Sequence, residues 1–310
     1  MSNRRNIFSS NLLIYCNFIL DLVYSNMSLP DKYIMIDRNF FYTCLTDFNI
    51  RHEPGKIQSG GEITTRKYGK YTFNISVDEY KQYYRILVLS QPLKKNNDEC
   101  IVVYIYKGIP IARLNNMTYM DNCAKEGLKR PGGGKVLLGF IIGYLQTFKD
   151  KYQINKIVLQ DNSFLYCDNC NRTIPIARLK MVTDNKTWYM NHGFKLYNST
   201  ANKTIPDAEM NQLLAENKKA FAKIKTIDID FDKIEKEVIQ VEKKFTLDPI
   251  KFNKLYKQYP LIQDFIKRLA KELDKYCCLL VYILEELFNP INRKKYDLFD
   301  FYQESFYFNL

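Results

Sequence analysis

The sequence predicts an α/β core followed by a mostly α-helical C-terminal region. Apolar residues follow strand periodicity from about residue 60, a glycine cluster then opens an apolar helix, and residues beyond 203 show apolar spacings of three and four. We therefore expect an N-terminal helix and irregular extension over residues 1–60, an α/β core with a mixed sheet over 61–198, and a helical region over 199–310.

The first strands of the core are predicted by alternation and by turn residues. Segments Glu62 to Lys67 and Tyr71 to Val77 alternate around a short turn, which is typical of a β-hairpin, and Tyr84 to Ser90 supplies the next strand. Two more apolar runs, Cys100 to Tyr106 and Ile109 to Leu114, are separated by a Lys-Gly turn. The polar residues between strands are expected to be loops.

A glycine cluster marks the change from strands to a helix. Three of the twelve glycines stand together at 132 to 134, and Lys135 to Lys149 (KVLLGFIIGYLQTFK) is apolar on most sides. A strand follows at Ile154 to Leu159, so the order is that of an α/β crossover unit. After a polar loop at 161–174, we expect a helix over Ile176 to Met190 and a strand over Phe194 to Tyr197.

Both ends of the chain are expected to be helical. Apolar periodicity predicts helices at Ala208 to Ile224, Phe231 to Phe245 and Pro249 to Leu287, the last interrupted at Pro260. At the other end, Leu12 to Val23 carries a polar stripe and is interpreted as an amphipathic helix in preference to a signal peptide. No segment approaches the roughly 18 apolar residues of a membrane span, so no membrane partner is expected.

The glycine cluster has the residue types of an anion site. Backbone without Cβ atoms can approach a ligand closely, and the free amides at a helix N-terminus attract negative charge. Lys129, Arg130 and Lys135 add positive charge around Gly132, Gly133 and Gly134. A pyrophosphate cradle and an ordinary turn before a helix both remain open. A P-loop is excluded, because no Ser or Thr follows Lys135 to hold magnesium.

Two motifs resemble the GNAT superfamily of N-acetyltransferases. The family's cofactor loop reads Gln/Arg-x-x-Gly-x-Gly/Ala, and Lys129, Gly132 and Gly134 have that spacing. Downstream, Tyr189 to Phe194 (YMNHGF) matches the family's Tyr-x-x-x-Gly-Phe pattern before a strand. Departures are the lysine in place of Gln or Arg, a proline at 131, and Val182 where the family usually has Asn.

The resemblance implies a mixed sheet of GNAT type and direct transfer from acetyl-coenzyme A to an amine, in a small molecule or a protein. The family's loop corresponds to Lys129, Arg130, Gly132, Gly133, Gly134 and Lys135, which would bind the cofactor. Tyr189 would protonate the departing thiolate, although a purely structural core tyrosine is the alternative. Two parallel strands should open in a V ahead of the glycines, and Glu126 and Asp121 are weak candidates for the proton acceptor.

Two alternatives are kept open. One is a catalytically inactive relative of the same fold that serves as a binding or scaffold protein. The other is a basic nucleic-acid-binding protein, because 46 basic residues against 34 acidic ones give a net charge of +12. The charge is spread along the chain without a long basic run, so nucleic acid is possible but not favoured.

The eight cysteines show no small secreted framework, so we expect a reducing, cytoplasmic setting. The composition is typical of an AT-rich genome, such as that of a large DNA virus, a protist or a low-GC bacterium; for a virus, the host cytoplasm or the virion applies. Cys167 and Cys170 are interpreted as free thiols, with half of a zinc site or a redox pair as alternatives and no metal expected. Cys277 and Cys278 are assigned to a core helix. Seven Asn-x-Ser/Thr sequons are attributed to chance in an Asn-rich chain.

Overall fold

The computed structural model describes residues 63–92, 98–129, 132–241 and 257–310. The extension expected at residues 1–60, its helix at Leu12 to Val23, and Arg130 all lie outside these ranges. Contacts group Gly60–Leu310 into one compact unit. None of the helices in the described ranges has the length and apolar character needed to cross a membrane.

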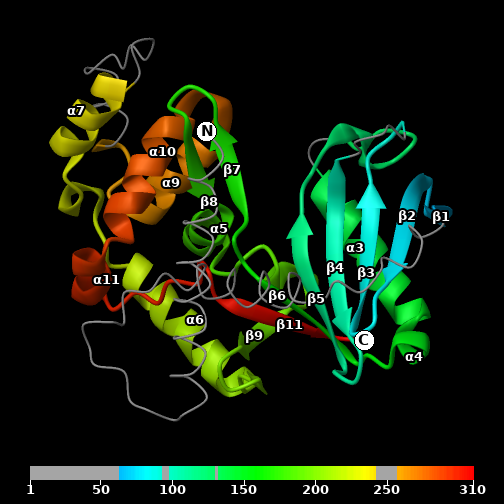
Figure 1. Cartoon of the computed structure of the whole chain (residues 1–310). Coiled ribbons are helices and arrows are strands. Elements are labelled where there is room, and N and C mark those ends of the chain that lie inside the picture. The colour runs from blue at the N-terminus through cyan, green and yellow to red at the C-terminus, as the bar shows by residue number, and fades with distance from the viewer. Residues whose placement is uncertain (1–62, 93–97, 130–131, 242–256) are drawn as a thin grey trace, which may run out of the picture. The chain divides into compact units, whose positions relative to one another are not determined.

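A nine-stranded mixed sheet forms the centre of the described chain (Figure 1). All neighbouring strands are antiparallel except β5 and β6, which run parallel. In spatial order the strands are β1 (Thr64–Tyr68), β2 (Tyr71–Glu79), β3 (Tyr83–Leu89), β4 (Glu99–Tyr106), β5 (Ile111–Met117), β6 (Lys156–Gln160), β11 (Ser305–Asn309), β9 (Lys195–Asn198) and β10 (Lys203–Thr204).

The expected strands of the core are confirmed within a few residues. Gly69 (φ 56°) and Gly108 (φ 83°) stand at the turns between β1 and β2 and between β4 and β5. A positive φ is strained for residues with a Cβ, so both turns favour glycine. The apolar runs of β3 and β4 lie in the middle of the sheet, where strands pair on both sides.

Helix α3 (Gly133–Thr147) connects the parallel strands β5 and β6 and packs on the sheet. Phe140 stacks on Phe73 of β2, with ring centroids 4.1 Å apart. A Cβ added at Gly139 would lie 2.5 Å from the Tyr68 hydroxyl, so this glycine lets strand β1 approach the helix. The apolar character of the helix therefore reflects burial against the sheet, as expected. A short helix, α4 (Lys149–Tyr152), follows.

The segment after β6 differs from expectation in two places. The stretch expected to be a polar loop forms a hairpin of β7 (Phe164–Cys167) and β8 (Arg172–Pro175). The next helix, α5 (Ile176–Asp184), ends earlier than predicted, because Asn185 adopts a left-handed cap at φ 56°. Tyr189 consequently precedes a 3₁₀ turn, η3 (Met190–His192), instead of ending a helix.

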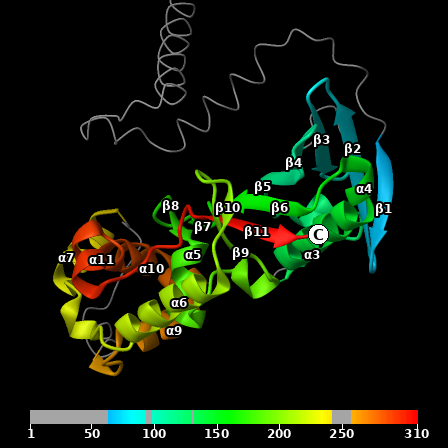
Figure 2. The ribbon, with the colours of Figure 1, turned by 90° about the horizontal axis from the view of Figure 1, so that it is seen from below.

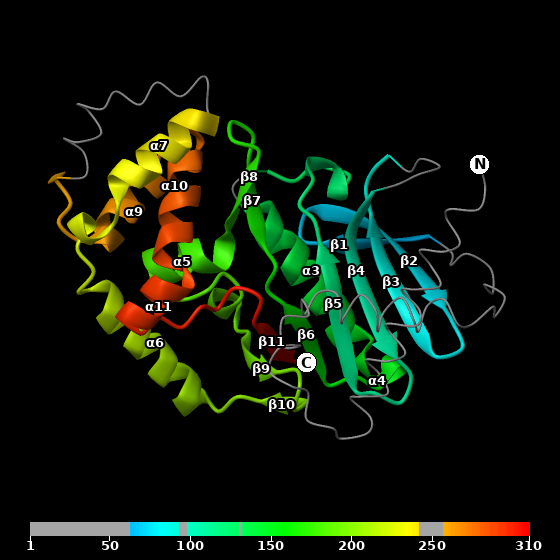
Figure 3. The same ribbon diagram turned by 60° about the vertical axis from the view of Figure 1, so that its left-hand side comes forward.

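The C-terminal region is mostly helical, as predicted, and its most buried helix is α10. Helices α7 and α9 and strand β8 pack around α10 (Figure 3). The helices are α6 (Asp207–Phe221), α7 (Phe231–Val241), α9 (Ile262–Ala270), α10 (Leu273–Leu287) and α11 (Pro290–Tyr296). Short 3₁₀ turns, η2 (Asp121–Cys123) and η4 (Thr226–Asp228), complete the assignment.

The last strand, which the sequence does not predict, returns to the core sheet. Strand β11 pairs with β6 on one side and β9 on the other (Figure 2). Residues 199–310 therefore do not form a region apart from the sheet. The expected boundary after residue 198 instead falls within the short β9–β10 hairpin.

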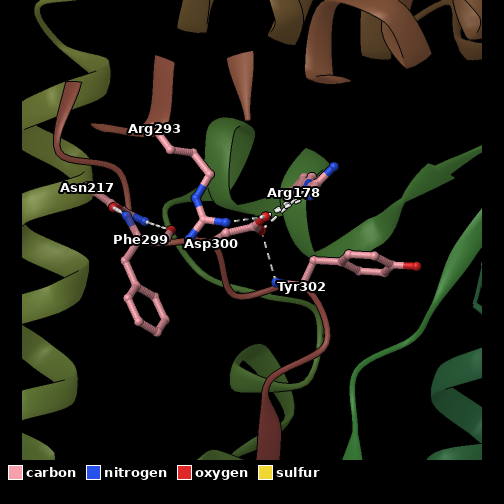
Figure 4. A network of polar contacts seen from close by, with 6 residues as sticks. All are labelled: Arg178, Asn217, Arg293, Phe299, Asp300 and Tyr302. Carbon is pink, nitrogen blue, oxygen red and sulfur yellow. Dashed lines mark hydrogen bonds and ion pairs between the residues drawn. The ribbon is translucent and has the colours of Figure 1, made fainter. Parts of the chain in front are cut away.

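A polar network fixes the chain just before β11 (Figure 4). The Arg178 guanidinium of α5 donates to the buried Asp300 carboxylate through Nε at 3.1 Å and Nη2 at 2.7 Å. Arg293 approaches the same carboxylate at 3.7 Å. Asn217 of α6 exchanges two hydrogen bonds of 2.8 Å with the backbone of Phe299. These contacts hold the returning segment against α5, α6 and Arg293 of α11.

Three disulfides join the six cysteines of the described ranges, which corrects the expectation of free thiols at Cys167 and Cys170. Cys167 bonds to Cys277 and Cys170 bonds to Cys278, with Cα atoms 5.8 Å apart in each pair. The third disulfide, Cys100–Cys123, joins β4 to η2. Cys277 and Cys278 are buried in α10, as expected, but they are cross-linked. The sequence spacing gave no sign of this pairing, because the partners are more than 100 residues apart.

Candidate functional site

The pairing of the parallel strands β5 and β6 ends near their carboxyl ends. The last paired residues are Leu114 and Leu159; β6 ends one residue later at Gln160, and β5 continues to Met117. A bulge in the β4–β5 ladder leaves Asn115 opposite no residue of either neighbouring strand. In parallel α/β sheets, ligands bind at the carboxyl ends of the strands. From this end of β5 the chain runs through η2 to the glycine loop.

The glycine loop forms the N-terminus of α3. Gly132 is exposed and adopts φ 115° as the N-cap residue, and no side chain caps the helix. The Gly133 amide donates to the Lys129 carbonyl at 3.0 Å. Lys129 and Lys135 are exposed on either side of the loop. An uncapped helix N-terminus with flanking lysines is favourable for an anion.

Packing explains one of the three glycines. Gly133 is buried, and a Cβ added there would lie 1.9 Å from the Tyr119 ring. The Tyr119 hydroxyl is held in place by donation to Asp121 Oδ1 at 2.7 Å and by the Leu128 carbonyl at 3.1 Å. Gly133 is thus required by the aromatic ring beside it, whereas Gly132 remains open to solvent.

The segment that carries Tyr189 contacts the glycine loop through the neighbouring residue, Trp188. The neighbouring Trp188 ring lies 3.6 Å from where a Cβ on Gly134 would stand, and the Trp188 and Tyr189 ring centroids are 5.0 Å apart. Tyr189 is 6% exposed and packs against Phe194 and Phe306. Burial, followed by the nearby charge of Asp161, raises the pKa of the Tyr189 phenol. The phenol therefore stays protonated at neutral pH.

Asp161 is the residue at this site that the sequence did not predict. It directly follows β6 and is fully buried. Its Oδ1 accepts hydrogen bonds from the Ser163 amide at 3.1 Å and from the Ser163 hydroxyl, while Oδ2 is buried and no partner for it is found in the described ranges. Burial raises the pKa of Asp161 to about 6. A buried, partly unsatisfied carboxylate is typical of functional sites.

A sequence signal for Asp161 did exist. A polar residue directly after an apolar strand lies at the carboxyl end of that strand, which is the usual position of ligand-binding residues in parallel sheets. Here Asp161 follows the apolar strand β6, and β6 is parallel to β5. The signal becomes useful only once the two strands are known to be parallel.

The two weak candidates for the proton acceptor are engaged elsewhere. The Glu126 carboxylate accepts hydrogen bonds from the Thr72 amide at 2.7 Å and the Thr72 hydroxyl at 2.8 Å. The backbone hydrogen bond from Thr72 is the main cause that lowers the pKa of Glu126. Asp121 accepts the hydroxyl of Tyr119. Both side chains therefore stabilise local structure, which does not favour either as the proton acceptor.

A groove of about 480 Å³ lies elsewhere, between α7, α10 and β8. Four of its five charged residues form two ion pairs: Arg172 lies 3.1 Å from Glu285, and Lys233 lies 3.0 Å from Glu286. The fifth is Glu237, so the groove lining has one more acidic than basic residue and lacks the excess of positive charge at the glycine loop.

Any function proposed for this chain rests on the chemistry of its site. Comparisons with models of protein families, with curated proteins and with solved structures gave no match.

Proposed function

We propose that this chain is an acetyl-coenzyme A-dependent N-acetyltransferase of GNAT type that transfers the acetyl group directly to an amine. The observation that carries the proposal is the uncapped N-terminus of α3, which follows the carboxyl end of β5 and contacts Trp188, the neighbour of Tyr189. The strand order β5, glycine loop, α3, β6 supports it, since the same order places a pyrophosphate on helix amides in many α/β proteins.

Each part of the site has a role in this reaction. The amide of Gly132 and the helix amides after Gly133 would hold the pyrophosphate, with Lys129 and Lys135 adding positive charge. The part of β5 beyond Leu114, which does not pair with β6, would hold the pantetheine and the thioester carbonyl through backbone hydrogen bonds. The amine attacks this carbonyl and loses a proton to solvent. The carbon–sulfur bond then breaks, and Tyr189 gives its proton to the departing sulfur.

Asp161 is proposed as a positioning residue for Tyr189. Its carboxylate is close enough to contribute to the raised pKa of the phenol. A negative charge beside the phenol raises its pKa, so the phenol is protonated before the thiolate forms. The same charge makes the phenol a weaker acid. The pKa of about 6 means that this charge is present at neutral pH and is lost in mild acid.

A second candidate is a binding protein of the same fold without catalysis. The burial of Tyr189 favours this candidate, because only 6% of the residue is exposed and its ring packs among aromatic side chains. Such a protein would bind coenzyme A without turning over its thioester.

Calorimetry with coenzyme A tests the cofactor site. We expect wild-type protein to bind, and the double change Lys129→Glu with Lys135→Glu to weaken binding by about tenfold or more, which corresponds to roughly 1.4 kcal/mol. The double change Lys218→Glu with Lys219→Glu, an equal charge change at exposed positions on α6, is the control and should leave affinity unchanged. Absence of coenzyme A binding to the wild-type chain refutes the proposal.

Turnover separates the two candidates. Release of the coenzyme A thiol from acetyl-coenzyme A is followed with spermidine and with polylysine as acceptors. An enzyme should lose about 100-fold or more in kcat on Tyr189→Phe, since general acid catalysis contributes at least this factor, while coenzyme A binding persists. If coenzyme A binds but its thiol is released with neither acceptor, the result supports the second candidate, a binding protein without catalysis.

A further inference from the structure

Two neighbouring disulfides connect the β7–β8 hairpin to helix α10. The hairpin supplies Cys167 and Cys170, and the helix supplies the adjacent Cys277 and Cys278. All four side chains are buried, and the helix carrying two of them is the most buried helix of the C-terminal region. The cross-links therefore join the insertion after β6 to the centre of the helical region.

Every cysteine in the described ranges forms a disulfide bond. All six are paired, and none is free. The third pair, Cys100 and Cys123, is fully buried on a different part of the sheet. Disulfides form and persist in oxidising compartments and are rare in the reducing cytosol. Three separate pairs at cross-linking distance indicate an oxidising compartment more strongly than a single approach of two thiols would.

Exposed sequons stand on two hairpin turns. Asn171, in the sequence Asn-Arg-Thr, lies between β7 and β8 with φ 53°, and Asn202, in Asn-Lys-Thr, lies between β9 and β10 with φ 50°. Both asparagines are exposed, as are the threonines Thr173 and Thr204 that complete the sequons.

The side-chain contacts of these asparagines leave Nδ2, the nitrogen that would carry a glycan, available. Oδ1 of Asn171 accepts the Tyr166 hydroxyl, and Oδ1 of Asn202 accepts the Tyr197 hydroxyl. In the described part of the chain, no hydrogen bond from Nδ2 of either residue is found. Glycosylation attaches the sugar to this nitrogen, on surface loops of secreted proteins.

We infer that this chain matures in an oxidising, secretory-type compartment, where the three disulfides form and where Asn171 and Asn202 accept N-linked glycans. This inference replaces the cytoplasmic expectation with a different proposal. Each disulfide forms when two thiols pass two electrons and two protons to a protein disulfide donor, which becomes a dithiol. Each glycan is attached when Nδ2 displaces the pyrophosphate of a lipid-linked oligosaccharide, forming a carbon–nitrogen bond and losing one proton.

The inference does not depend on the proposed acetyltransferase activity. It rests on cysteine pairing and on surface turns, none of which lies in the coenzyme A site. Should both proposals hold, the acyl donor must be present on the same side of the membrane as the mature protein.

Mass spectrometry of the full chain, isolated from the cells that naturally make it, tests the inference. Lysis in N-ethylmaleimide blocks free thiols, and digestion without reductant preserves disulfides. We expect peptides containing Cys167 and Cys170 to be linked to the peptide containing Cys277 and Cys278. After treatment with an N-glycosidase, Asn171 and Asn202 should be read as Asp. Asn74, a sequon residue buried in β2, is the internal control and should remain Asn.

The opposite results are equally clear. If these four cysteines carry N-ethylmaleimide without prior reduction, their thiols were free, and the inference of oxidative maturation is overturned. Linked peptides together with unmodified Asn171 and Asn202 overturn the secretory assignment, and leave a chain oxidised in some other compartment. Neither result bears on coenzyme A binding, so failure here is distinct from failure of the proposed function.

Discussion

Removing the two neighbouring disulfides together should destabilise the chain by more than the sum of removing each one alone. Cys167–Cys277 and Cys170–Cys278 close almost the same long loop, with separations of 110 and 108 residues. While either remains, the long loop stays closed in the unfolded chain. The unfolded state gains its large additional freedom only when both are gone.

The magnitude follows from chain entropy. Closing a loop of 110 residues reduces the entropy of the unfolded chain by an amount worth about 5 kcal/mol. The second disulfide then closes a ring of only roughly six residues, which is worth about 2 kcal/mol. Replacing either pair by alanines should therefore cost about 2 kcal/mol, and replacing both should cost about 7 kcal/mol. The excess over additivity is about 3 kcal/mol.

Urea denaturation of wild type, the two single-pair variants and the four-alanine variant measures this excess. The control is the pair Cys100→Ala with Cys123→Ala, which closes a separate loop of 23 residues. It should cost about 3 kcal/mol whether or not the neighbouring disulfides are present. Additive free energies for the two neighbouring pairs, or a single-pair loss near 5 kcal/mol, would contradict the shared-loop reasoning.

Three further predictions concern packing, pH and a buried ion pair. Gly133→Ala places a Cβ 1.9 Å from the Tyr119 ring and should lower the free energy of unfolding by about 1–3 kcal/mol in urea. The pKa of Asp161 is raised from 3.8 to about 6, so the wild type should lose up to about 3 kcal/mol of stability as pH rises through this window, a loss that Asp161→Asn should abolish. Asp300→Ala leaves the Arg178 guanidinium without its buried partner and should cost about 3–5 kcal/mol by thermal or urea unfolding.

Matched variants check the cause in each case. Gly134→Ala places its Cβ 3.6 Å from Trp188, an ordinary contact, so a loss as large as that of Gly133→Ala would argue against the packing explanation. A stability difference between wild type and Asp161→Asn that is equal at pH 4 and pH 7.5 would contradict the raised pKa. Lys180→Met removes the exposed ion pair with Asp184 and should change stability by less than about 0.5 kcal/mol.

The candidate site was only half predictable from the sequence. Lys129, Gly132 and Tyr189 were selected from motif spacing, and the contact between Trp188 and the glycine loop brings these segments together. Asp161 was missed, because its significance depends on burial and on the parallel pairing of β6, which no local pattern encodes.

The sequence by itself determined the strands β1 to β6 and β9, the turns between the first of them, and the helix that follows the glycines. These features depend on short-range chemistry: alternation of apolar residues, glycine at turns with positive φ, and a long apolar helix that must be buried. Each acts within a few residues, so one chain is enough to reveal it. The strands β2, β3 and β4 were placed within a few residues in this way.

Only the tertiary structure decided the insertion of β11 between β6 and β9, the pairing of the cysteines, and the burial of Asp161. Strand β11 pairs with residues about 150 positions earlier in the chain, and four cysteines alone allow three pairings. Such choices are made by the total burial and hydrogen bonding of the folded chain. They leave no periodic trace in the sequence, because the residues that meet are distant from each other along it.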